Sequence, residues 1–158
     1  MSDDNEHIAH IFLDEKTVVR RSPQIEHERQ VAIFDLLEEN AFALKSAAAG
    51  PYDLHLSVSD NRLVFDVRTA GDQALEQFSL PAKNFRRIVK DYFLICESYF
   101  DAIKTKPPSQ IEAIDMGRRG LHDEGADILR ERLAEHAVVD KMTARRLFTL
   151  VCVLHIRG

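Results

Sequence analysis

The residues best suited to chemistry lie in one stretch of the chain, Ser109 to Leu133. Wound as an α-helix at about 100° per residue, the stretch places Arg118 and His122 one turn apart on a stripe that is otherwise apolar, with Asp115 at its edge. Polar residues normally lie at exposed positions, so polar residues on a core-facing stripe suggest a specific structural or functional role. A guanidinium can donate two hydrogen bonds to one carboxylate or phosphate. The cluster, together with the adjacent Arg119, is therefore a candidate binding site for an anionic small molecule.

The same cluster has a second interpretation, a structural network of ion pairs. Asp115 is one turn from Arg118 and can be the partner that a buried guanidinium requires. Arg118 would then disfavour protonation of His122 near neutral pH. Both interpretations depend on a helix that continues through Gly117 and Gly120, each of which costs roughly 1 kcal/mol in a helix interior.

The sequence contains no motif for other chemistry. It lacks HExxH, GxSxG and the glycine-rich phosphate-binding patterns. Cys96 and Cys152 lie inside apolar segments, which predicts reduced thiols in the core. Carboxylates and histidine at positions 122–124 offer metal ligands, but adjacent residues of a helix point apart. We therefore expect no catalytic residue, no metal and no cofactor.

Composition limits the class of protein. The length of 158 residues, with 45% hydrophobic and 30% charged residues, is typical of one soluble domain over residues 1–158, with a loose acidic tail over residues 1–6. The 26 acidic residues exceed the 21 basic ones and give a net charge of -5, which argues against general binding to nucleic acid or an anionic membrane. The N-terminus lacks the pattern of a secretory signal, and no apolar run is long enough to span a bilayer. A cytoplasmic location is expected.

The elements that must position the cluster indicate an α+β fold. Apolar and polar residues alternate from Tyr52 to Leu80 and predict a small antiparallel sheet, a three-stranded meander. His7 to Leu13 is a further strand candidate. Because these strands are followed by a run of helices, we expect the sheet to pack against about four helices and not to form βαβ units.

The first turn of the meander predicts its register. With Asp60-Asn61 as a two-residue turn, Leu56 lies opposite Phe65 on one face and His55 lies opposite Asp66 on the other. Apolar residues then meet apolar residues, and opposite charges meet, as a stable sheet requires.

Helix signals recur in four segments. Val31, Phe34, Leu37, Ala41 and Leu44 are spaced as in a helix. The first three expected helices run from Pro23, capped by Ser22, to about Ala47; from Pro81 to a point before Lys106; and from Ser109, in a capping box with Glu112, to about His136. The last is capped by Asp140 or Thr143 and contains the apolar residues from Leu147 to Ile156.

The last of these helices is apolar nearly all round, which predicts a central core element or an oligomer interface. A β-strand is the rival prediction, because Val151 and Val153 are β-branched. If the segment is helical, Val151 or Leu154 can reach a second chain, so we expect a homo-oligomer.

Several long segments carry a resemblance to a known family. They are IEHERQVAIFDLLEEN, DNRLVFDVR, RRIVKDYFLICESY, PSQIEAIDMGRRGLHDEG and ARRLFTLVCVLHIRG. By these segments the chain resembles the uncharacterised bacterial protein family numbered two hundred and sixty-two, typical of alphaproteobacteria, from about His7 to Gly158. The resemblance implies a bacterial cytoplasmic protein and brings no functional residues with it.

Two hypotheses of function follow from the sequence. The first is a regulatory or protein-interaction protein without catalysis, itself a homo-oligomer. The second is a small enzyme or ligand-binding protein that holds an anionic molecule at Arg118 and His122. A cavity open to these two side chains would favour the second hypothesis, whereas a filled contact would favour the first.

Overall fold

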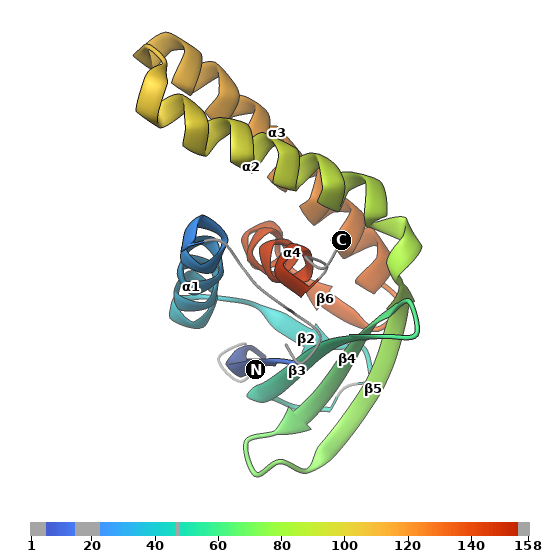
Figure 1. Ribbon diagram of the computed structural model, residues 1–158. Coiled ribbons are helices and arrows are strands. Elements are labelled where there is room, and N and C mark those ends of the chain that lie inside the picture. Colours follow the sequence, from blue (N-terminus) through green and yellow to red (C-terminus); the bar gives the residue numbers. More distant parts are fainter. Residues whose placement is uncertain (1–5, 15–22, 47, 155–158) are drawn as a thin grey trace.

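The computed structural model describes residues 6–14, 23–46 and 48–154 (Figure 1). In this part of the chain, a sheet of four strands and a sheet of two strands pack with four α-helices, so the predicted α+β class is confirmed. The strands are β1 (Ile8–Leu13), β2 (Phe42–Leu44), β3 (Tyr52–Ser59), β4 (Arg62–Thr69), β5 (Ala74–Pro81) and β6 (Ala137–Val139). The α-helices are α1 (Pro23–Glu38), α2 (Arg86–Thr105), α3 (Pro108–Leu133) and α4 (Lys141–Leu154), and the short 3₁₀ helix η2 spans Ala82–Asn84.

The larger sheet has the strand order β1-β3-β4-β5. Strands β3, β4 and β5 form the predicted antiparallel meander. The sheet is not purely antiparallel, however, because β1 pairs in parallel with β3. Between β1 and β3 the chain passes through α1, and parallel neighbours need such a crossover connection.

The predicted hairpin register is confirmed. Leu56 pairs with Phe65, and His55 pairs with Asp66. The turn residues Asp60 and Asn61 have φ angles of 53° and 61°. Both values are positive, as a type I′ turn requires, and this turn matches the twist of the strands that it joins. The hairpin therefore has a local cause.

Helix α1 ends well before the predicted Ala47. The side chain of Asn40 terminates it: Nδ2 donates to the Leu36 carbonyl at 2.8 Å and to the Ile8 carbonyl at 2.9 Å, and Oδ1 accepts from the Ile8 amide at 2.7 Å. Asn40 thus fastens the end of α1 to β1. The predicted cap, Ser22, lies outside the described residues.

Strands β2 and β6 were not predicted. They pair antiparallel with each other, with Ala43 opposite Val138. Each has three residues, and each lies where the sequence predicted either helix or a connection. Such short strands depend on a partner that is distant in the sequence, and no local pattern identifies them.

Two predicted helix starts are wrong. Pro81 ends β5 instead of opening a helix, and α2 begins at Arg86 after η2. Helix α3 begins at Pro108 with Pro107 in the N-cap position and no side-chain cap, so the capping box at Ser109 does not form. Proline suits the first position of a helix because its φ is already helical and it has no amide hydrogen to satisfy.

Helix α4 is the central helix, as predicted. Its N-cap is Asp140, whose Oδ1 accepts from the Thr143 amide at 3.0 Å. Every residue from Leu147 to Leu154 is buried by the chain itself. Val151 and Leu154 therefore cannot reach a second chain, and the basis on which self-association was predicted is wrong.

Helices α2 and α3 form a long antiparallel hairpin (Figure 1). Its base packs over α4, and its tip extends away from the rest of the molecule (Figure 1). Within the described residues, no helix combines the length and the apolar character that crossing a membrane demands.

Candidate functional site

The polar cluster of the sequence lies on an unbroken helix. Helix α3 runs through both Gly117 and Gly120. A Cβ at Gly117 would lie 2.8 Å from Cδ1 of Ile95, whereas a Cβ at Gly120 would meet nothing within 4 Å. Gly117 thus marks the close approach of α2, where the flexible end of the Ile95 side chain lies against the backbone of α3.

Arg118 is held by two carboxylates. Its Nη2 and Nε lie 3.0 and 3.2 Å from Oδ1 of Asp115, the predicted partner. Its Nη1 lies 3.3 Å from Oε2 of Glu28, which projects from α1. The guanidinium also stacks over Tyr99, with 4.6 Å from Cζ to the ring centroid. The side chain of Arg118 is only 19% exposed, so this pairing offsets the cost of burying its charge.

Glu28 is the member of this network that sequence reasoning missed. Besides Arg118, it accepts a hydrogen bond of 3.0 Å from the hydroxyl of Tyr92 on α2. One carboxylate of α1 therefore joins both helices of the α2–α3 hairpin.

Next to this network, burial raises the pKa of the Cys96 thiol to about 11, so Cys96 is a core thiol at neutral pH.

Arg119 lies on the outer side of the same network. Its Nη2 is 2.9 Å from Oδ2 of Asp115, and its side chain is 70% exposed. Asp115 thus binds two guanidinium groups, one on each carboxylate oxygen. Three of the four predicted site residues, Asp115, Arg118 and Arg119, are in direct contact.

The fourth, His122, faces a different neighbour. Its Nε2 lies 3.4 Å from Oγ1 of Thr149 on α4, and its ring centroid lies 5.0 Å from that of Tyr92. Burial, aided by Arg145 and Arg118, lowers the pKa of His122 to about 4. The imidazole is therefore neutral at physiological pH, as predicted, but it packs against α4 while Arg118 packs toward α1.

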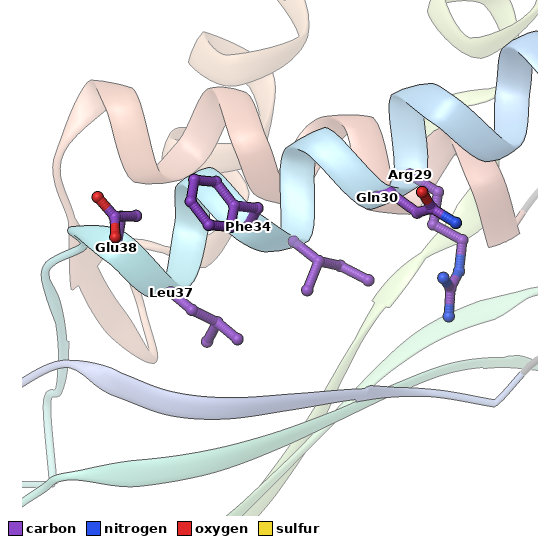
Figure 2. A pocket seen from close by; sticks show the side chains of 6 residues that line it. Arg29, Gln30, Phe34, Leu37 and Glu38 are labelled. Carbon is purple, nitrogen blue, oxygen red and sulfur yellow. The ribbon is translucent and has the colours of Figure 1, made fainter.

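A groove that the sequence did not identify lies along α1 (Figure 2). Its volume is about 400 Å³. Two rows of side chains, each spaced by four residues, border it and run side by side along the helix (Figure 2). One row is Arg29, Ile33 and Leu37, and the other is Gln30, Phe34 and Glu38.

The apolar residues of this face are open to solvent. Phe34 is 65% exposed, and Val31 and Leu37 are 43% and 40% exposed. The opposite side of α1 buries Ile25, Ala32 and Leu36 instead. Helix α1 is therefore apolar on two sides, and its sequence periodicity does not reveal which side the core covers.

A second hollow, of about 450 Å³, lies on the outer face of the larger sheet. The Phe12 ring stacks on His55 at a centroid distance of 4.5 Å, and Arg68 pairs with Asp66 at 2.7 Å. Pairing of β1 with β3 brings Phe12 onto this face, and the sequence did not predict that pairing. None of the four predicted site residues lines this hollow or the α1 groove.

The described residues contain no group of three or more His, Cys, Asp or Glu side chains placed to hold a metal ion. Both cysteines are free and buried. Burial also raises the pKa of Cys152 well above its usual value.

Comparison with known proteins supports the resemblance seen in the sequence. A family model described as an uncharacterised protein family, UPF0262, matches residues 5–157. The chain belongs to this family. UPF0262 relatives include proteins of Rhodospirillum rubrum, 61% identical over 98% of this chain and 96% of the relative, and of Paramagnetospirillum magneticum, 62% identical over 96% of both chains. A UPF0262 protein of Ruegeria pomeroyi is 55% identical over 96% of this chain and 97% of its own.

These relatives are alphaproteobacterial, as the resemblance implied. No solved structure matches the chain. UPF0262 names no activity, so family membership assigns no role to any residue, and the geometry has to support a function by itself.

Proposed function

We propose that this UPF0262 protein acts in the cytoplasm by binding another protein chain, without catalysis, and that the exposed face of α1 is its binding surface. The observation that carries the proposal is the set of large apolar side chains on one face of α1, of which Phe34 is 65% exposed. Contiguous apolar surface of this kind is typical of interaction sites, because covering it removes apolar area from water.

The shape of the face agrees with this role. A groove between two rows of side chains spaced by four residues is the surface into which a row from another helix fits. The apolar centre would supply the burial, and the polar residues at both ends would form the rim of the interface. Helix-in-groove contacts of this type are a common mode of recognition.

Site-specific photo-crosslinking in the native bacterium tests the proposal. A photoreactive phenylalanine analogue would replace Phe34 or Leu37 on α1. Leu94 on α2, which is also exposed and apolar, is the matched control. We expect discrete protein adducts from positions 34 and 37 and none from position 94. Equal adducts at all three positions, or none at any of them, would count against α1 as the binding face.

Binding of an anionic small molecule at Arg118, Arg119 and His122 is a second candidate. The two guanidinium groups around Asp115 support it, because a ligand carboxylate or phosphate could replace Glu28 on Arg118. Against it, Arg118 already faces two carboxylates, and a ligand would have to displace one of them. Thermal melts in inorganic phosphate test this candidate: it requires stabilisation of the wild-type protein that Arg118→Lys abolishes.

A further inference from the structure

The residues that line the α1 groove are arranged symmetrically about one point. The midpoint of the groove lies between Ile33 and Phe34. Counting outward from it, Gln30 corresponds to Leu37, and Arg29 corresponds to Glu38. The lining thus has an apolar centre, with a cation at one end and an anion at the other.

This arrangement fits a two-fold axis. When two identical helices pack antiparallel about an axis between positions 33 and 34, residues equidistant from the axis come together. Ile33 of each chain then meets Phe34 of the other, and Arg29 meets Glu38. Each end of the groove would gain a pair of opposite charges, and the apolar centre would be covered.

The reverse orientation does not fit. In a parallel pair, each residue meets its own copy, so Arg29 would face Arg29 and Glu38 would face Glu38. Like charges in direct opposition destabilise an interface. Within one chain, Arg29 lies 3.4 Å from Glu26 on the same helix, so a partner's Glu38 would add its carboxylate to the groups that already contact that guanidinium.

We infer that the chain which fills the α1 groove is a second copy of this protein, packed antiparallel about a two-fold axis between Ile33 and Phe34. The inference rests on the proposed function, since it names the partner of that same surface. It also places self-association at α1 and not at α4, where Leu147 to Leu154 are buried by the chain itself.

Measurement of the mass in solution is the first test. Sedimentation equilibrium of the purified protein at micromolar concentration should give twice the 18.0 kDa of one chain. Phe34→Asp should give 18.0 kDa, because it places a charge at the centre of the contact. Leu94→Asp, which changes an exposed apolar residue on α2, should leave the doubled mass intact.

Charge reversal tests the orientation. In an antiparallel dimer, Arg29→Glu alone and Glu38→Arg alone each create two like-charge pairs, so each should weaken the dimer by about tenfold or more. An equimolar mixture of the two variants restores opposite charges at both ends and should form heterodimers with near wild-type affinity. A variant that had failed to fold would not recover on mixing, so this result cannot arise from misfolding.

Three outcomes would overturn the inference: a wild-type mass of 18.0 kDa at all micromolar concentrations, a doubled mass that survives Phe34→Asp, or no recovery on mixing. Each is distinguishable from failure of the proposed function. If the purified protein is monomeric but position 34 still crosslinks to other proteins in the cell, α1 remains the binding face and only the second copy is rejected.

Discussion

The two halves of α3 belong to one helix but lie in different surroundings. The second half packs against α4 and contains all the buried residues of the helix: Gly125, Ala126, Leu129 and Leu133. The first half packs against α2 in the part of the hairpin that extends away from the body (Figure 1). There Ile111 and Ile114 are only half-buried, and Met116 is 64% exposed. Helical periodicity thus predicts which face of α3 is apolar, but the number of neighbouring elements decides how far that face is buried.

The polar cluster lies where these two halves meet. Arg118 is bonded to Glu28 of α1, and His122 contacts Thr149 of α4. Arg118 and His122 are thus one helical turn apart but differ in charge. Carboxylates compensate the charge of Arg118, whereas burial keeps His122 neutral. Four predictions for residues of α3 test this contrast, from the largest expected effect to the smallest.

Protonation of His122 in acid should have the largest effect on the stability of the protein. The pKa of His122 in the folded protein is about 4, below the value of an exposed histidine, so the unfolded chain binds the extra proton first. The contribution of the neutral imidazole is complete above about pH 6.5 and is lost as the pH falls toward 4. Between pH 7.5 and pH 4.5 this loss should reach roughly 2–3 kcal/mol.

Denaturant unfolding of wild type and His122→Gln across this pH range measures the effect. The variant should lose less stability than wild type as the pH falls, because glutamine does not titrate. His27→Gln, which replaces an exposed histidine on α1, is the control and should follow wild type. Parallel pH curves for wild type and His122→Gln would show that His122 is not the titrating group.

Gly125→Ala should damage the buried half of α3. The new Cβ would lie 2.5 Å from three ring carbons of Phe148, which is fully buried. Overpacking against a rigid ring should lower the free energy of unfolding by about 2 kcal/mol, even though alanine favours the helix. Gly117→Ala meets only the flexible end of Ile95 and should cost much less. Equal losses in the two variants would contradict the contrast between the halves.

Arg118→Lys tests the ionic side of the junction. Lysine keeps the charge but cannot bridge Asp115 and Glu28 with a planar fork, so the protein should lose about 1–2 kcal/mol of stability. Arg119→Lys changes a residue that contacts the same Asp115 but is exposed, and it should have little effect. If both variants melt like wild type, the network is not structural, and the case for a ligand at Arg118 becomes stronger.

Gly120→Ala should have the smallest effect, and it should be a gain. A Cβ at this position meets no atom within 4 Å, so only the helical propensity changes. We expect an increase in stability of up to about 1 kcal/mol. A loss measured by calorimetry would mean that the exposed half of α3 has a neighbour in solution that covers Gly120.

The sequence by itself determined the features with local causes. The hairpin register follows from a two-residue turn at Asp60-Asn61 with alternating residues on both sides. The Asp115–Arg118 pair follows from a spacing of three residues on one helix, and the neutral His122 follows from burial beside cationic neighbours. For the turn and the Asp115–Arg118 pair, the interacting groups lie close together along the chain, so periodicity and spacing contain the information. For His122 the local part is the neighbouring Arg118, and packing of α3 against Tyr92 and α4 supplies the burial and the second cation, Arg145.

Only the tertiary structure decided the contacts between distant segments. It placed β1 parallel to β3, paired β2 with β6, and brought Glu28 of α1 onto Arg118. It also decided that Leu147 to Leu154 of α4 are buried while Phe34 on α1 stays exposed. An apolar stripe shows that a face can be buried, but whether it is buried depends on which elements the fold packs against it. For this reason the sequence predicted α4 as the surface for self-association, whereas we propose α1.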